Sequence, residues 1–336
     1  MRIFPGRTTA AIIAITAISM GAATGLTLKF ATIAPQATPW GAAMERMVSD
    51  LNGISGGELD VKVFHGGIAG DESDILRKLK IGQLQGAALT NLGLNLISPE
   101  ALTLSAPFLI QDDDELDYII AKNRAYMQGK IEAKGFIVLA WSKAGWIRFF
   151  SKAPLSAPAD LKGMKLSTTP TDLSLAQAFK TLGYNLVPVP LNETLVALSS
   201  GMIDACYISP LAAGAMQFFG SAKYMTDFRV SPFIGAIIVS KQSWAKVNPT
   251  TKARIHEYAT AIEKNLNEEI VKLEDSAVTT MVKYGLVITK NTPEQVDAWK
   301  KDIQQGIPAT LGTSFDRDFY LLLSSQLEEY RAKKKK

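Results

Sequence analysis

The chain has 336 residues, of which 47% are hydrophobic, 20% charged and 8% aromatic, and its formal net charge is +4. This length exceeds the roughly 250 to 300 residues that one hydrophobic core organises, and the composition excludes a disordered chain, so we expect two folded lobes. Two arginines lie near the N-terminus and four lysines end the chain. Without these six charges the net charge is −2, and no basic face indicates nucleic-acid binding.

The first 23 residues have the pattern of a secretory signal peptide. Arg2 and Arg7 form a positive start, residues 8–23 are small and apolar, and Gly21-Ala22-Ala23 offers small residues for cleavage. The alternative is an uncleaved membrane anchor, although this stretch barely reaches the length that spans a bilayer. We therefore expect a periplasmic protein. The single cysteine, Cys206, can form no intramolecular disulfide and lies in an apolar run typical of a buried thiol.

Strands and helices alternate in the first half of the chain. Apolar patterns predict strands at 26–34, 58–64 and 84–89, and helical spacing predicts helices at 39–53 and 71–81, the first capped by Thr38. The strand at 84–89 is apolar on both faces, and strands buried in this way and separated by helices favour a parallel sheet covered by helices on both sides. We expect residues 136–141 to continue this sheet.

The pattern then begins again. Strands are predicted at 164–168, 184–190 and 202–208, with helices at 171–183 and 191–201. The stretch "LKIGQLQGAAL" at 79–89 is echoed by "LSSGMIDACYI" at 198–208, and in both a helix ends at a glycine, Gly82 or Gly201, before a buried strand. Two such runs predict two similar lobes. Since open α/β sheets bind ligands beyond the carboxyl ends of their strands, we expect a binding cleft between the lobes.

The last hundred residues connect and cover the two lobes. Residues 235–244 are predicted to form a strand that crosses between the lobes, and an apolar stripe at 249–285 predicts one helix about 50 Å long, which would span both. A capping box at Thr292–Gln295 begins another helix, and 314–333 forms the last. The expected division is 26–146 plus 235–272 for lobe I, 147–234 plus 273–305 for lobe II, and 306–336 for a C-terminal helix with a basic tail.

Residues for catalysis or metal binding are scarce. His65 and His256 have no second ligand at metal spacing, and no nucleophile elbow, phosphate loop or dinucleotide fingerprint occurs, so we expect no metal and no cofactor. The acidic run "QDDDELD" at 111–117 is typical of a solvated first helical turn. The sequence favours a binding protein that is not an enzyme.

Several motifs resemble one family. "GWIRFFSKAPLSAPADLKGMKL" at 145–166 and "LGYNLVPVPLNETLVALSSGMIDACYISPLAA" at 182–213 are similar to the solute-binding subunits of tripartite ATP-independent periplasmic (TRAP) transporters. This resemblance implies a two-lobed fold of the type II periplasmic-binding-protein class, with parallel-rich sheets covered by helices. It also implies a monomer that closes around a small solute and delivers it to an integral-membrane permease.

The sequence departs from the family at the residues that usually hold a carboxylate. Most members have an arginine where Ser167 follows Lys165-Leu166, and Ser167 and Thr168 offer only neutral hydroxyls. A second family arginine is matched by Arg148, one residue out of register, which either contacts the solute or forms an ion pair at the lobe edge. We therefore expect a relatively hydrophobic solute, with a monocarboxylate held by Arg148 alone as one candidate. Some members without the arginine resemble those that work with a tetratricopeptide-repeat helper protein, a further expected partner.

The remaining candidates for the cleft wall follow predicted strands or begin helices. For the aromatic residues among them, a place in the core is the alternative, and Glu72 could instead stabilise the start of its helix. The full set of candidate ligand-binding residues is Trp40, Glu72, Thr90, Asn91, Trp146, Arg148, Ser167, Thr168, Leu191, Tyr207, Ser209 and Phe233.

Two other functions remain open at this stage. A ligand sensor or partner-binding protein could use the same closure as a signal. An enzyme on this fold would need a nucleophile or an acid and base in the cleft, and Cys206 is the only thiol.

Overall fold

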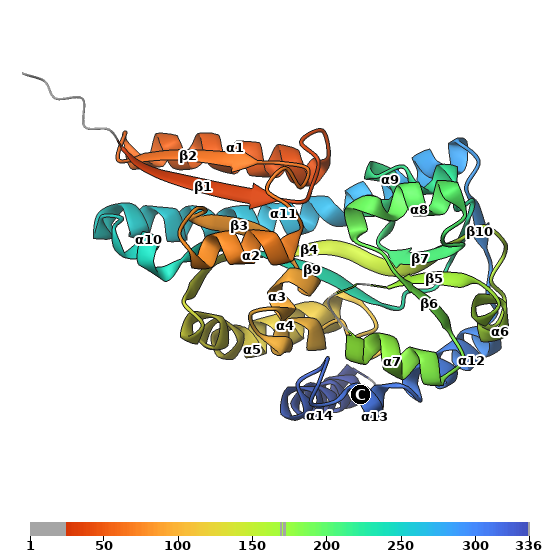
Figure 1. Ribbon diagram of the computed structural model, residues 1–336. Helices are drawn as coiled ribbons and strands as arrows, with labels where there is room; N and C mark the ends of the chain where they lie inside the picture. The colour runs from red at the N-terminus through yellow and green to blue at the C-terminus, as the bar shows by residue number, and fades with distance from the viewer. Residues whose placement is uncertain (1–24, 169, 171–172, 335–336) are drawn as a thin grey trace, which may run out of the picture.

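The computed structural model describes residues 25–168, 170 and 173–334. The predicted signal peptide, the first two residues of the helix predicted at 171–183 and the last two lysines lie outside the described residues. Within the described part, the strands follow the order β2-β1-β3-β9-β4-β7-β5-β6, with β8 beside β4 and β10 beside β8. Figure 1 shows this sheet running through two helix-covered halves.

Lobe I contains the N-terminal parallel strands, with β1 between β2 and β3. Hydrophobic clusters cover both faces of this sheet, as its strand patterns predict. The first helix begins as expected, because the Thr38 side chain accepts a hydrogen bond from the Gly41 N–H and Pro39 occupies the first turn. Its elements are β1 (Leu26–Thr32), α1 (Pro39–Ser55), β2 (Leu59–Phe64), α2 (Glu72–Lys80), β3 (Gly86–Thr90), α3 (Asn91–Asn95), α4 (Pro99–Thr103), α5 (Asp113–Ala133) and α10 (Lys241–Ala245).

Lobe II repeats the arrangement, with β5 parallel to both β6 and β7. The repeated glycines have the same role in both lobes: Gly82 has φ 74° and Gly201 has φ 77°, the left-handed conformation that ends a helix. Its elements are α6 (Pro158–Lys162), β5 (Lys165–Thr168), α7 (Leu173–Thr181), β6 (Asn185–Pro188), η1 (Leu191–Glu193), α8 (Thr194–Ser200), β7 (Ala205–Ile208), α9 (Pro210–Ala215), η2 (Phe218–Gly220), β8 (Tyr224–Thr226), β10 (Val287–Thr289) and α12 (Pro293–Gln304).

Two long strands join the lobes. β4 (Phe136–Ser151) and β9 (Ser231–Ser240) run antiparallel to each other, β9 also pairs with β3, and β4 pairs with β7. The strand predicted at 136–141 is therefore longer than predicted, and although it runs in the same direction as β3, its neighbour in lobe I is the antiparallel β9. Its sequence continues through Lys143 and Gly145, which look like a loop but form an irregular strand where the register shifts between Lys143 and Trp146. We call this place the crossing.

Helix α11 (Pro249–Lys283) spans both lobes, as predicted. It has 35 residues, which gives a length of about 50 Å. Ile255 packs in the lobe I core, Ile270 contacts Ala43 and Leu211 in a small cluster between the lobes, and Met281 packs in the lobe II core. A single helix thus contributes to three hydrophobic clusters.

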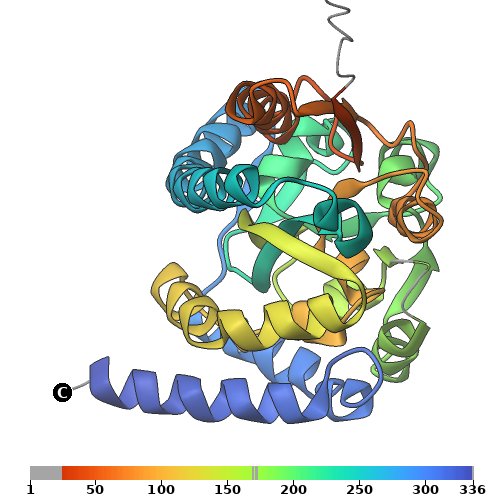
Figure 2. The same ribbon diagram turned by 90° about the vertical axis from the view of Figure 1, so that its left-hand side faces the viewer.

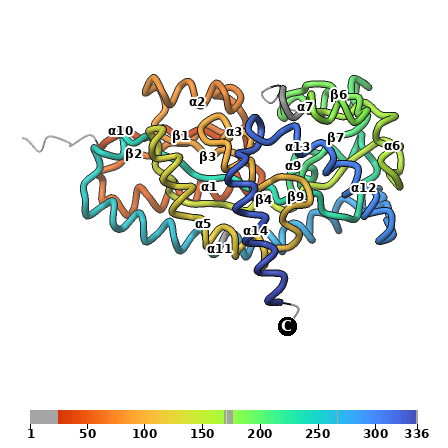
Figure 3. Tube along the Cα trace, turned by 90° about the horizontal axis from the view of Figure 1, so that it is seen from below, coloured from red at the N-terminus to blue at the C-terminus, as the bar shows by residue number. Residues whose placement is uncertain are grey.

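The C-terminal segment packs on lobe I rather than standing apart. After α13 (Ile307–Thr310), helix α14 (Arg317–Lys334) places Phe319, Leu323 and Leu327 in the lobe I core, and Figures 2 and 3 show it lying beside α5. The Arg331 guanidinium bonds both carboxylate oxygens of Glu115 at 2.7 Å. The expectation of a solvated acidic turn at 111–117 is therefore wrong for Glu115, which is 4% exposed, because the basic end of α14 covers it.

Within residues 25–168, 170 and 173–334, every helix is too short or too polar to cross a bilayer.

Candidate functional site

Two apolar cavities lie at the junction of the lobes. The first, with about 120 Å³ of free volume, is bounded by α3 and α4 of lobe I and by β5, β6, β7 and α7 of lobe II. The second, with about 110 Å³, is bounded by α1, α11 and the ends of β1 and β3, together with α9 of lobe II. A water molecule needs roughly 10 to 15 Å³ by this kind of measure, so each cavity can hold several non-hydrogen atoms.

Polar groups in the first cavity are few and neutral. The Tyr184 hydroxyl donates to Asp302 at 2.8 Å, and the Ser105 hydroxyl donates to the Pro232 carbonyl at 2.8 Å. Asn91 differs, because it is 3% exposed and its Oδ1 has no hydrogen-bond partner among the described residues. Among the described residues of this wall, Asn91 is therefore the one with a buried side-chain polar atom that no protein group bonds.

The second cavity has a single charged lining residue among the described residues. That residue is Glu263 of α11, whose carboxylate is ion-paired with Arg124 and accepts the Trp141 backbone N–H at 2.9 Å. Trp40, Met44 and Met47 of α1 supply much of the apolar wall. The second cavity suits an uncharged group.

Seven of the twelve candidate residues line these cavities. Asn91, Thr168 and Tyr207 line the first, Trp40 and Thr90 line the second, and Leu191 and Phe233 line both. The structure does not place Glu72, Trp146, Arg148, Ser167 or Ser209 on either wall.

Arg148 lies on the opposite face of the lobe II sheet from the first cavity. Its neighbours Ile147 and Phe149 both line that cavity, and successive side chains of a strand point to opposite faces. The Arg148 guanidinium instead donates to the Asp227 carbonyl at 2.6 Å, under helix α11. The one-residue offset noted in the sequence therefore presents Ile147 to the cavity and removes Arg148 from it.

Ser167 follows the same rule. Leu166 and Thr168 of β5 line the first cavity, whereas Ser167 lies between them and is buried toward the other face. The position of the usual family arginine thus does not face either cavity.

Two more candidates support the wall without forming it. The Glu72 carboxylate accepts hydrogen bonds from the Thr90 backbone N–H at 2.6 Å and the Thr90 hydroxyl at 2.7 Å, and burial raises its pKa. Ser209 is fully buried and caps α9 by accepting from the Ala212 N–H. Glu72 therefore orients Thr90, and Ser209 orients the helix that follows β7.

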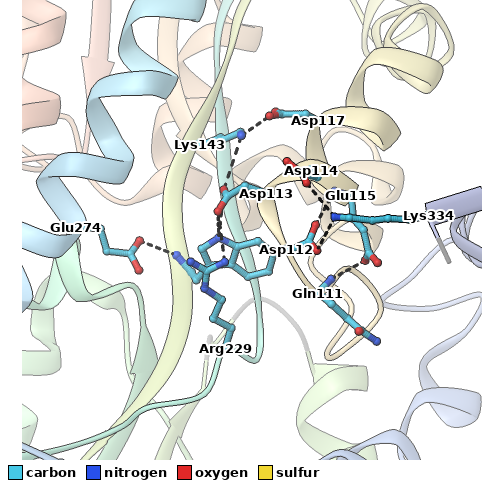
Figure 4. Close-up of polar contacts among 11 residues, drawn as sticks. Gln111, Asp112, Asp113, Asp114, Glu115, Asp117, Lys143, Arg229, Glu274 and Lys334 are labelled. Atoms are coloured by element: carbon cyan, nitrogen blue, oxygen red, sulfur yellow. Dashed lines mark hydrogen bonds and ion pairs between the residues drawn. The ribbon is translucent and has the colours of Figure 1, made fainter. Parts of the chain in front are cut away.

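Trp146 belongs to a polar cluster at the crossing. Figure 4 shows the Asp113 carboxylate between Lys143 and Arg229, at 3.7 Å and 3.3 Å. The Trp146 indole N–H donates to Asp113 at 3.2 Å, and the Arg229 guanidinium lies 4.8 Å from the ring centroid. Asp113 of lobe I thus fixes side chains of β4 and of the segment that precedes β9, which extends the role of the acidic run beyond a helix start.

Glu274 of α11 completes this cluster. Its carboxylate accepts the Trp146 backbone N–H at 2.9 Å, and burial raises its pKa from 4.5 to about 7. A side chain at Gly145, where φ is 88°, would place its Cβ 2.0 Å from this carboxylate. Only glycine permits the approach of Glu274 to the crossing.

Sequence reasoning missed lining residues that do not follow a strand. Those of the first cavity come from helices, turns and the C-terminal region, and their apolar pattern is the same as that of core residues. They include Leu92, Leu102, Pro107, Phe179, Ile303 and Phe315.

The single thiol and the possible metal ligands can be located in the described part of the chain. Burial raises the pKa of the Cys206 thiol to about 12, so it is an unreactive core residue. No group of three or more histidine, cysteine or acidic side chains within the described ranges is arranged to hold a metal ion.

Comparisons with known proteins identify relatives of this fold and sequence. Residues 30–310 match the family model of the bacterial extracellular solute-binding proteins, family 7 (DctP). The chain is 25% identical over 231 residues to a solute-binding protein of Chromohalobacter salexigens, which covers 68% of each protein. It is 28% identical over 197 residues to the 2,3-diketo-L-gulonate-binding periplasmic protein YiaO of Escherichia coli, which covers 57% of this chain and 59% of YiaO.

Solved structures share the fold at lower sequence identity. A TRAP periplasmic solute-binding protein from Sulfurospirillum deleyianum with bound succinate superposes with a TM-score of 0.81 at 22% identity, over 88% of this chain and 97% of that chain. One from a Sulfitobacter species with bound β-D-galacturonate gives 0.81 at 18% identity, over 89% and 99%. These matches confirm the predicted two-lobed fold and the family resemblance.

Proposed function

Since this chain belongs to family 7 of the bacterial extracellular solute-binding proteins, we propose that it is the periplasmic receptor of a TRAP transporter for a small, largely apolar organic molecule. The ligand would bind between the lobes, and closure about the crossing would present it to the membrane permease. We propose a monomer exported by its N-terminal signal peptide. We also propose a tetratricopeptide-repeat helper protein as a partner, because the sequence resembles members of the family that use one.

The observation that carries this proposal is that the walls of the two cavities have no positively charged side chain among the described residues. Among the described residues that line the two cavities, no lysine, arginine or histidine occurs. Ile147 occupies the inward-facing position of β4, while Arg148 is bound to backbone carbonyls on the other face.

This wall disfavours the acidic solutes bound by the two solved relatives. A carboxylate enclosed without a matched donor costs several kcal/mol, and a dicarboxylate would carry that cost twice. An apolar group gains about 25 cal/mol for each Å² removed from water in the same place. The monocarboxylate anchored by Arg148 alone loses its support, because that guanidinium does not face either cavity.

Native mass spectrometry of the protein, purified from periplasm without refolding, tests the proposal. We expect a bound molecule of low polarity that mild collisional activation releases from the protein. The same mass should be found in an organic extract of the protein. Co-purification of succinate, another dicarboxylate or a uronate would overturn the proposed ligand class.

A further inference from the structure

The two cavities share part of their walls, and we call this shared part the neck. Leu191 of η1 and Phe233 of β9 line both, one from lobe II and one from a crossing strand. Strand β9 pairs with β3 only from Gly235 to Val239, so Phe233 lies just past the last β3 partner. Around Phe233, β9 pairs with β4 and no longer with β3.

In each lobe, residues close together in the sequence line the two cavities. Thr90 lines the second cavity and Asn91, the next residue, lines the first. On lobe II, Tyr207 of β7 lines the first cavity and Ala212 of α9 lines the second. Each lobe therefore contributes one short, continuous stretch of chain to both cavities.

The two cavities differ in what they offer a polar group. The first contains the unpaired Oδ1 of Asn91, which is buried. In the second, Thr90 is bonded to Glu72 and Glu263 is paired with Arg124. The Trp141 ring packs in the lobe I core, and its buried indole N–H has no hydrogen-bond partner among the described residues. The first cavity suits a neutral hydrogen-bonding group, and the wall of the second, apart from that N–H, suits hydrocarbon.

We propose that the two cavities are subsites for one elongated amphiphile, with a neutral hydroxyl or amide head at Asn91 and an apolar tail that passes between Leu191 and Phe233 into the second cavity. This inference rests on the proposed function and specifies its ligand. A hydroxyl head can donate or accept, so it pairs with the Asn91 amide in either orientation. The tail removes apolar wall from water in both lobes at once, so binding of the whole molecule stabilises the closed arrangement.

A homologous series of 1-alkanols, from butanol to decanol, measures whether both subsites are used. Calorimetric titration of the wild-type chain should show an affinity gain of roughly fourfold for each added methylene, the usual gain for burying one CH₂, continuing through the longest members. A ligand confined to the first cavity would gain only until that cavity is full.

Two variants assign the parts of the ligand. Ala212→Phe fills the second cavity from a partly exposed position of α9, so it should leave butanol binding unchanged and remove the gain of the longer alkanols. Asn91→Leu should weaken every alkanol by a similar factor, because it removes the partner of the head. Leu92→Phe, a matched filling of the first cavity, should weaken short and long members alike.

The outcomes separate this inference from the proposed function. If affinity stops rising at the same chain length in wild type and Ala212→Phe, the second cavity is unused and the two-subsite inference is wrong, while an apolar ligand in the first cavity still stands. A thermal melting curve shows whether the protein used is folded. If the folded protein binds none of the alkanols, the inference of a neutral head is wrong. The proposed function is then decided independently, by the ligand that co-purifies. Equal losses of affinity for all alkanols in Ala212→Phe would also overturn the two-subsite inference.

Discussion

Replacing Glu274 with glutamine removes an ionisable group from the crossing but keeps an acceptor for the Trp146 backbone N–H. The carboxyl lies among Arg148, Arg229 and Asp113, and it is 7% exposed. Burial is the largest influence on its pKa and raises it from 4.5 to about 7, against the opposing effect of the two arginines.

The size of the expected change in stability follows from the raised pKa of Glu274. A carboxyl whose pKa is higher in the folded state keeps its proton between about pH 4.5 and 7, where the unfolded chain has lost it. The stabilisation from this group is complete below pH 4.5 and is lost as the pH rises through 7. A difference of about 2.5 pH units corresponds to about 3 kcal/mol, so the free energy of unfolding of Glu274→Gln relative to wild type should rise by about that amount across this range.

Urea unfolding of both proteins at intervals between about pH 4 and pH 8 measures the difference. Glu269→Gln is the matched control, since Glu269 lies on the same helix and is 51% exposed beside Arg46. Its difference from wild type should stay within about 0.5 kcal/mol at every pH. A constant difference between wild type and Glu274→Gln over the whole range would show that Glu274 titrates as a solvated carboxyl, and would refute the argument.

Further substitutions test the two faces of the lobe II sheet. Arg148→Ala should leave the ligand-induced change in melting temperature intact, while the unligated fold loses about 1 to 3 kcal/mol because the Thr226 and Asp227 carbonyls lose a donor; a lost ligand response would return Arg148 to the site. Ile147→Arg should strengthen succinate binding by about 10- to 100-fold, as a charged hydrogen bond does, whereas Ser167→Arg should not. The reverse ranking in calorimetry would contradict the assignment of the faces.

Local patterns predicted most of the fold. The Thr38 and Thr292 caps and the left-handed Gly82 and Gly201 depend on contacts within one element, and the apolar stripe of α11 is a spacing within one helix, so the sequence records them all. The crossing did not follow from such patterns. The charged Lys143 interrupts the apolar run of β4, and its burial depends on Asp113 and Asp117 from a distant helix.

The candidate site was also predicted only where local sequence patterns determine it. Residues at strand ends, such as Asn91, Tyr207 and Phe233, were placed in the cleft because the carboxyl edge of a sheet predicts them. The sequence left two places open for Arg148, the cleft or the lobe edge, because in a strand a shift of one residue exchanges one face for the other. Phe315 and Ile303 reach the first cavity through packing between lobes, which no local pattern encodes.

The most direct test of the apolar cleft is a calorimetric comparison of wild-type protein with succinate, galacturonate and an apolar ligand such as octanol at several temperatures. An apolar cleft without a basic side chain should give no detectable heat with either acid up to millimolar concentration, and should bind the apolar ligand with a negative heat-capacity change. Micromolar binding of succinate or galacturonate by the unaltered chain would contradict this prediction.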